Sequence, residues 1–186
     1  MNKITYDVVV IGGGPAGMAA ALKAAEAGAS TAIVERNAQL GGILRQCIHP
    51  GFGLTYFKEE LTGPEYAQRF IDRVEDSPIK VYLDSMVLSI HHDDESGTSG
   101  VVFMSETGMV TLTAHAVVLA MGCRERTRSE IKIPGSRPAG VFTAGLAQRY
   151  INIENLKPGS RFVILGSGDI GLIMARRLAL EGFEVE

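Results

Sequence analysis

Residues 8–35 read VVVIGGGPAGMAAALKAAEAGASTAIVE, and this stretch decides the fold. An apolar run of strand length, Val8–Ile11, opens it, and a second apolar run, Thr31–Val34, closes it. An alanine-rich helix is predicted between them to about Ala27, with Gly28 ending it. A glycine triplet joins the first strand to this helix, and its members are Gly12, Gly14 and Gly17. The order of strand, glycine turn, helix and strand predicts a βαβ unit with a parallel sheet.

Each glycine of the triplet has a physical task. Gly12 permits a tight turn from strand to helix, Gly14 lets the backbone approach a pyrophosphate, and Gly17 lets the helix lie close to the sheet. The helix N-terminus then offers free N–H groups and the positive end of its dipole to phosphates. Pro15 suits the first helical turn, where its missing N–H costs nothing. The stretch therefore predicts a site for a nucleotide diphosphate, and the alternative is a glycine-rich turn without a ligand.

Glu35 follows the second predicted strand directly. An acid at this place accepts hydrogen bonds from the ribose hydroxyls of a dinucleotide. Because its carboxylate repels a 2′-phosphate, this first site is not expected to hold NADP. Residues 8–35 are called the first fingerprint below.

The pattern occurs a second time in residues 162–186, FVILGSGDIGLIMARRLALEGFEVE, called the second fingerprint. Its glycines stand 154 positions after those of the first fingerprint and are Gly166, Gly168, Gly171 and Gly182. Two fingerprints predict two dinucleotides, one a flavin and one a nicotinamide. On this register the counterpart of Glu35 falls after Glu186, so a fragment of a longer protein is expected. The alternative for the second triplet is a close helix–sheet contact, because Asp169 would lie near the phosphates.

Composition and charge exclude several classes of function. With 46% hydrophobic and 21% charged residues, the chain has the make-up of a globular protein. The net charge of −3 and the absence of a basic block argue against nucleic-acid binding. The sequence contains no apolar run of 18 residues, so no membrane span is predicted. Asp7 interrupts the N-terminal apolar stretch, so no signal peptide is predicted. Two cysteines, 76 positions apart, make no disulfide framework or zinc site, so a reducing cytoplasm is expected.

Between the fingerprints the sequence predicts one helix and several short strands. Thr62–Glu65 reads as a capping box with a proline in the first turn, and the apolar pattern continues to about Asp76. Residues 91–100, HHDDESGTSG, are expected to be a solvated connection, with a metal site as the alternative. Another helix is predicted over Leu146–Ile151. The predicted strands lie near residues 80–90, 101–105, 109–113 and 116–120.

The fingerprints, the pair Gly41-Gly42, AVVLAMGCRER before IPG, and VILGSGDIG together resemble the FAD-dependent pyridine nucleotide–disulphide oxidoreductase superfamily. This resemblance implies an α/β, three-layer Rossmann-like fold that binds FAD and NAD(P), with a β-meander. It also implies that the chain is a fragment of a two-dinucleotide-domain flavoprotein. Residues 1–124 would be the N-terminal part of the FAD-binding domain, 125–158 the inter-domain connection, and 159–186 the start of the NAD(P)-binding domain.

The resemblance also assigns cofactor-binding residues. Gly122 ends a strand beneath FAD, with Met121 where the family has Thr, and Arg36 meets the adenosine half beside Glu35. The implied FAD contacts are Gly12, Gly14, Pro15, Ala16, Gly17, Glu35, Arg36, Gly41, Gly42 and Gly122. The implied NAD(P)H contacts are Gly166, Gly168 and Gly171, and no metal is implied.

The chain departs from the disulphide-reducing members of that superfamily. Their motif needs two cysteines in one loop, but Leu44 stands at the first position and Cys47 is alone. The resemblance is therefore to the branch near opine, sarcosine and cyanide-forming amine oxidoreductase subunits. Arg45, Cys47 and His49 remain the catalytic candidates. Cys47 either forms a transient flavin or mixed-disulphide adduct or is a buried inert thiol. Arg45 and His49 either tune the charge of the reduced flavin or only hydrogen-bond the loop. Cys123 is expected to be structural.

The family's late Gly-Asp segment, which completes FAD binding, is also missing. GVFTAGL resembles it, but Leu146 replaces the Asp. We therefore expect incomplete FAD binding or contacts from another chain. The resemblance implies an oxidoreductase that passes a hydride from NAD(P)H or a small reduced substrate to FAD. The alternative is an electron-transfer subunit without its own substrate, which serves a partner amine or hydroxyacid oxidase; a homo-oligomer is compatible with both.

Overall fold

The structure, a computed structural model, describes residues 4–136 and 138–186. The described residues form two compact units. The first unit contains the residues up to Arg45 together with Pro50–Gly122. The second contains Gln46–His49 and the residues from Cys123 to Glu186. The expected assignment of 1–124, 125–158 and 159–186 to FAD, a connection and NAD(P) remains a prediction.

The first unit begins with the βαβ arrangement that the first fingerprint predicts. Strand β1 (Ile4–Ile11) leads through the glycine turn into helix α1 (Pro15–Glu26), and β2 (Thr31–Val34) follows. Strands β1 and β2 pair in parallel, with Val8 opposite Thr31 and Ile11 opposite Val34. Helix α1 ends at the cap residue Ala27, and Gly28 then turns the chain with a φ of 89°. The left-handed conformation at that position favours glycine.

The predicted capping box is confirmed at the start of α2 (Gly63–Glu75). The Thr62 hydroxyl accepts from the Glu65 N–H, and the Glu65 carboxylate accepts from the Thr62 N–H at 2.8 Å. These bonds satisfy two amide donors that a helix start leaves open. The short 3-10 helix η1 (Gly42–Gln46) lies between β2 and α2.

The central strands differ from the predicted ones in three places. Residues 80–90 do not form one strand: Asp84 has a φ of 47° and separates β3 (Lys80–Tyr82) from β4 (Met86–Asp93). The polar connection is shorter than predicted, because β4 pairs with β5 (Thr98–Ser105) from His91 to Asp93. The two strands expected near 109–113 and 116–120 are one, β6 (Gly108–Leu119).

Strand β6 is long because it has different partners along its length. Its first half pairs antiparallel with β5, with Met109 opposite Met104, and its second half pairs in parallel with β1, with Leu119 opposite Ile11. The resulting sheet has the order β3-β2-β1-β6-β5-β4. The first three strands and the end of β6 are parallel, whereas β4, β5 and the start of β6 form the predicted meander.

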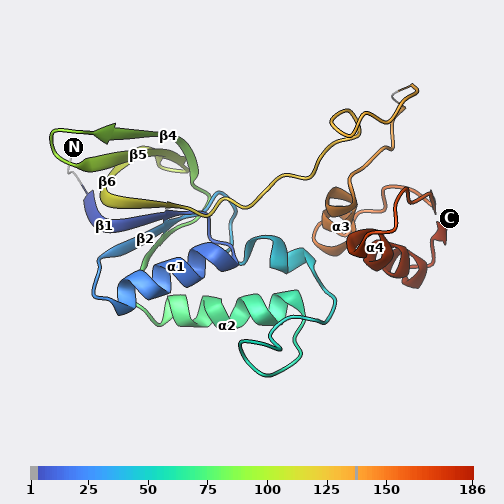
Figure 1. Ribbon diagram of the computed structural model, residues 1–186, viewed down its shortest axis with the longest axis horizontal. Coiled ribbons are helices and arrows are strands. Elements are labelled where there is room, and N and C mark those ends of the chain that lie inside the picture. Colours follow the sequence, from blue (N-terminus) through green and yellow to red (C-terminus); the bar gives the residue numbers. More distant parts are fainter. Residues whose placement is uncertain (1–3, 137) are drawn as a thin grey trace. The chain divides into compact units, whose positions relative to one another are not determined.

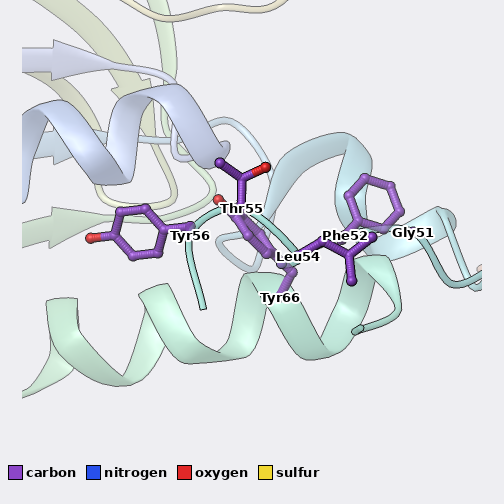
Figure 2. Close-up of a pocket in the computed structure, with 7 residues that line it drawn as sticks. Gly51, Phe52, Leu54, Thr55, Tyr56 and Tyr66 are labelled. Atoms are coloured by element: carbon purple, nitrogen blue, oxygen red, sulfur yellow. The ribbon is translucent and has the colours of Figure 1, made fainter. Parts of the chain in front are cut away.

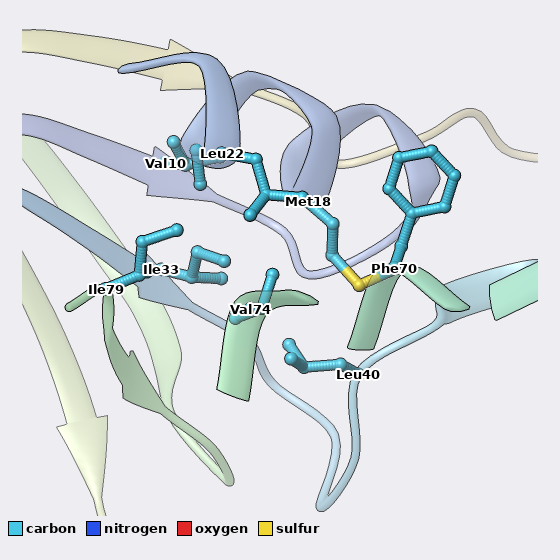
Figure 3. Packing of buried hydrophobic residues seen from close by; sticks show 9 residues of the cluster. Val10, Met18, Leu22, Ile33, Leu40, Phe70, Val74 and Ile79 are labelled. Carbon is cyan, nitrogen blue, oxygen red and sulfur yellow. The ribbon is translucent and has the colours of Figure 1, made fainter. Parts of the chain in front are cut away.

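Two apolar clusters explain the three layers of this unit. On one side of the parallel strands, α1 and α2 pack together (Figure 1), and Figure 3 shows their side chains converging with those of the sheet. This cluster contains Val10, Met18, Ala21, Leu22, Ile33, Leu40, Phe70, Val74 and Ile79. The second cluster joins β1 and β2 to the meander through Val9, Ile11, Ala32, Val34, Val101, Phe103, Leu112 and Ala114. The predicted Rossmann-like fold with a β-meander is therefore confirmed.

The second unit carries the second fingerprint. Helix α3 (Ala144–Asn152) confirms the helix predicted near 146–151. Strand β7 (Arg161–Phe162) pairs in parallel with β8 (Glu184–Val185), and helix α4 (Asp169–Leu180) connects them. A small core holds α3 to α4 and contains Ile151, Met174 and Leu178.

Candidate functional site

The first glycine turn lies where two parallel strands end. Gly12 follows β1 with a φ of 106°, and its N–H donates to the Val34 carbonyl at 2.9 Å. A side chain at Gly12 would overlap the Ala120 carbonyl oxygen, just after β6. Ligands of such sheets bind outside the carboxyl ends of the strands, at the point where the strand order reverses. That point lies between β1 and β6 here. From β1 the sheet continues to β2 and β3 on one side, and from β6 it continues to β5 and β4 on the other.

The turn is packed so closely that three of its glycines have no room for a side chain. A Cβ at Gly17 would overlap the Gly12 carbonyl oxygen and lie 3.3 Å from a methyl group of Val10 on β1, so the helix lies close to the sheet as expected. A Cβ at Gly13 would overlap a methyl group of Leu40. Sequence reasoning missed Gly13 and Leu40; the third consecutive glycine was the signal for the first, whereas nothing local marked Leu40.

Glu35 holds the turn as well as following the strand. Its side chain is 5% exposed, and Oε2 accepts from the Gly13 N–H at 2.7 Å. Its other oxygen, Oε1, accepts from the N–H and the side-chain amide of Asn37, at 2.8 and 2.7 Å. Carboxylates bonded to backbone N–H groups form strong, charge-assisted hydrogen bonds. The ribose contact of Glu35 remains a prediction, and Asn37 is a supporting residue that the sequence analysis did not identify.

The pair Gly41-Gly42 packs directly against the fingerprint turn. Gly41 donates its N–H to the Gly13 carbonyl at 2.9 Å, and a Cβ at Gly42 would lie 2.9 Å from the Gly14 Cα. Both glycines have positive φ values, of 107° and 54°. The segments around Gly13 and Gly41, 28 positions apart, thus meet backbone to backbone. Glycines permit this close approach because they carry no side chain.

Gly14 leaves open space where the pyrophosphate was expected. It caps α1 in an extended conformation, and a Cβ there would meet only the Gly42 Cα, at 3.9 Å. Within Gly14–Glu26, no side chain caps the helix and no acid stands in its first turn. The first amides of α1 therefore face open space beside the Gly42 backbone, and this donor set fits the diphosphate of FAD. Arg36 and Gly122 are exposed, and their roles remain predictions.

The three catalytic candidates are divided between the units. Arg45 belongs to the first unit, whereas Cys47 and His49 belong to the second. Cys47 is 8% exposed, and burial raises the pKa of its thiol, so little thiolate forms near neutral pH. Cys47 is thus buried, and its role toward the flavin remains a prediction. Cys123 lies beyond β6 and is exposed, so burial lends no support to the structural role expected for it, which stays a prediction.

A hollow in the first unit lies directly after the three catalytic candidates in the sequence (Figure 2). An antiparallel bridge between Phe52 and Leu61 closes residues 52–61 into a loop. Within it, the Phe57 N–H donates to the Gly53 carbonyl at 2.7 Å. The hollow is lined by Gly51, Phe52, Gly53, Leu54, Thr55, Tyr56 and Tyr66. Its lining holds no charged side chain, so it offers no strong anchor for an ionic substrate.

The second fingerprint repeats the turn in a looser form. Gly166 has a φ of 123° and Gly168 caps α4 in an extended conformation, as their counterparts do in the first unit. A Cβ at Gly171 would lie 3.3 Å from the Gly166 carbonyl oxygen, which is tight without overlap. Asp169 stands in the first turn of α4. The backbone thus fits a second nucleotide, and the binding roles of these glycines remain predictions.

Residues 6–186 match the family model described as pyridine nucleotide-disulphide oxidoreductase. The chain belongs to this family. Hydrogen cyanide synthase subunit HcnB of Pseudomonas protegens is 32% identical over 98% of this chain and 38% of its own length. An opine oxidase subunit of Agrobacterium tumefaciens is 31% identical over 95% of this chain and 35% of its own length. The chain therefore spans little more than a third of these relatives.

Solved structures agree with this family membership at the level of the fold. L-proline dehydrogenase from P. horikoshii superposes with a TM-score of 0.76 at 23% identity, over 99% of this chain and 35% of that one. Thioredoxin reductase from T. acidophilum superposes with a TM-score of 0.69 at 25% identity, over 98% of this chain and 55% of that one. Members of the pyridine nucleotide-disulphide oxidoreductase family are FAD-dependent oxidoreductases. Among residues 4–136 and 138–186, no helix combines the length and apolar character needed to cross a bilayer.

Proposed function

We propose that the first fingerprint holds FAD and the second holds NAD(P)H, in an oxidoreductase that passes a hydride from NAD(P)H or a small reduced substrate to FAD. The observation that carries this proposal is the open cradle at Gly14, formed by an uncapped helix start and the backbone of Gly42. Bound FAD supplies the hydride-accepting chemistry, and the protein supplies position and electrostatics.

The chain's own residues divide the binding task. The first amides of α1 donate to the diphosphate, and the first turn of this helix holds no acid that would repel it. Glu35 accepts from a ribose hydroxyl with the lone pair of Oε2 that Gly13 and Asn37 leave open. Arg36, Gly41, Gly42 and Gly122 complete the contacts with the cofactor in this proposal. Arg45 or His49 sets the charge near the flavin.

A second candidate function is an electron-transfer subunit that serves a partner oxidase. The names of two relatives are compatible with it, because both are subunits: of hydrogen cyanide synthase and of opine oxidase. The partner oxidase would then bind the reduced substrate itself. Thiol–disulphide reduction is disfavoured because Leu44 stands where a second loop cysteine is needed. The reducing cytoplasm remains the predicted compartment.

Anaerobic reduction of the full-length protein tests this proposal. We expect a flavin absorbance spectrum that NADH or NADPH bleaches without any partner protein. Flavin that is bound but bleached only when a partner oxidase and its substrate are present would favour the second candidate. A full-length protein that cannot be loaded with FAD would contradict both.

A further inference from the structure

The four residues Gln46–His49 belong to the second unit, although the chain on both sides of them belongs to the first. The chain leaves the first unit after Arg45, at the end of η1, and returns to it at Pro50. The segment contains two of the three catalytic candidates, Cys47 and His49. A specific set of contacts must therefore hold it in the second unit.

Those contacts are made by amide groups on α3. The Gln46 side chain donates from Nε2 to the Gly145 carbonyl and to Gln148 Oε1, both at 3.0 Å. The Gln46 main-chain carbonyl accepts from Asn152 Nδ2 at 2.8 Å. Gln46 and Gln148 are 8% and 1% exposed. Buried polar groups are costly when a partner is removed, so these bonds specify one place for the segment.

The same network continues to the helix of the second fingerprint. Asn152 Oδ1 accepts from Arg177 Nε at 3.1 Å, and Arg177 on α4 also pairs with Glu181 one turn later. Asn152 thus bonds to the candidate segment with one end of its amide and to α4 with the other. Helix α3 thus connects the segment that contains Cys47 to α4, the helix capped by Gly168.

We propose that Gln148 and Asn152 are positioning residues, which fix Gln46–His49 on α3 so that the second unit carries Cys47 and His49. Any movement of the second unit relative to the first then moves these two side chains, while the Gly41-Gly42 pair stays with the FAD cradle. Their role toward the flavin rests on the proposed function; their attachment to α3 does not.

The inference predicts which unit protects the Cys47 thiol. In a Cys123→Ser background, Cys47 is the single cysteine, and its alkylation by iodoacetamide reports when the segment opens. Leu178→Ala destabilises the core of the second unit, and Val74→Ala that of the first; the two side chains are 3% and 1% exposed. We expect Leu178→Ala to raise the alkylation rate at least tenfold and Val74→Ala to change it less than twofold. Equal increases, or a larger increase with Val74→Ala, would overturn the inference.

A second set of variants tests the amide network itself. Gln148→Met removes one of the two acceptors of the Gln46 side chain and keeps the side-chain length, so the alkylation rate should rise about tenfold. Gln148→Glu keeps an acceptor oxygen and replaces Nε2, which has no partner among the described residues, with a second oxygen. Because burial favours the protonated, neutral carboxyl, this variant should restore slow alkylation. Gln68→Met on the exposed face of α2 is the matched control. A Gln148→Met rate equal to that of this control, or no rescue by Gln148→Glu, would refute the positioning role.

Failure of this inference is distinguishable from failure of the proposed function. The alkylation rates are measured on the chain without flavin, whereas the proposed function is tested by the loading and bleaching of FAD. Slow, network-dependent alkylation in a protein that binds no FAD would leave the positioning role standing and reject the flavin assignment.

Discussion

The two fingerprints form the same backbone turn in different surroundings. Gly12 and Gly166 both have left-handed φ values, of 106° and 123°, and each turn leads into a helix of twelve residues. The strand residues before them differ in burial: Val9 is fully buried, whereas its counterpart Val163 is 75% exposed. Local sequence is therefore sufficient for the turn, whereas burial depends on neighbouring strands and helices. In the first unit those neighbours are β2, β6 and two helices.

The largest expected difference concerns the third glycine of each triplet. Gly17→Ala would drive a methyl group into the Gly12 carbonyl, so α1 must move away from the turn. We expect a loss of more than about 3 kcal/mol in the free energy of unfolding of the first unit. Gly171→Ala meets a carbonyl oxygen at 3.3 Å and should cost about 1 kcal/mol or less. Urea unfolding followed by circular dichroism measures both, and equal losses would show that the two turns are equally tight.

Matched core truncations test the difference in burial. Val9→Ala removes two buried methyl groups and should cost about 2 kcal/mol of unfolding free energy. Val163→Ala removes largely exposed groups and should change it by less than about 0.5 kcal/mol. Thermal melts of the two variants at one protein concentration provide the measurement. A cost at Val163 as large as that at Val9 would mean that Val163 is buried in solution.

Glu35→Gln tests the bond that supports the first turn. The variant weakens the charge-assisted bond from the Gly13 N–H, and we expect a loss of about 1.5 kcal/mol in unfolding free energy without any ligand. Glu181→Gln in the second unit, which breaks the exposed pair with Arg177, should cost about 0.5 kcal/mol or less. Chemical denaturation of the flavin-free chain separates this structural role from the ribose contact. Unchanged stability of Glu35→Gln would leave only the role at the ribose.

The smallest effect is a dependence of stability on pH through Cys47. Burial raises the pKa of the folded thiol above that of the unfolded chain, so the unfolded state loses its proton first as pH rises. Stability is unaffected below the unfolded pKa of about 8.5 and falls above it, by at most about 1.4 kcal/mol for each pH unit. Cys47→Ala in the Cys123→Ser background should flatten this fall between pH 8 and 10 in urea titrations. An identical slope in both proteins would contradict the burial of the thiol.

The sequence predicted those parts of the molecule that local residues control. The glycine turns, the capping box at Thr62 and the helices α1, α2 and α4 follow from short patterns whose physics is local. The strands were predicted less well because β6 is one strand only through pairing with both β5 and β1. The break between β3 and β4 was missed because the left-handed residue there is Asp84 and not a glycine. The bond of Glu35 to Gly13 and the attachment of Gln46 to α3 join residues 22 and 102 positions apart, which no short pattern encodes.

The most direct test of the account substitutes the one glycine in each triplet that combines room for a side chain with an ordinary φ. Gly14→Ala and Gly168→Ala meet no atom closer than 3.9 Å, and both positions have ordinary backbone angles, so both variants should fold normally. Titration of the flavin-free full-length protein with FAD, followed by fluorescence quenching, should show at least tenfold weaker binding for Gly14→Ala. Gly168→Ala should bind FAD like the unmodified protein. Equal FAD affinity in Gly14→Ala and the unmodified protein would contradict the assignment of the flavin diphosphate to the first fingerprint.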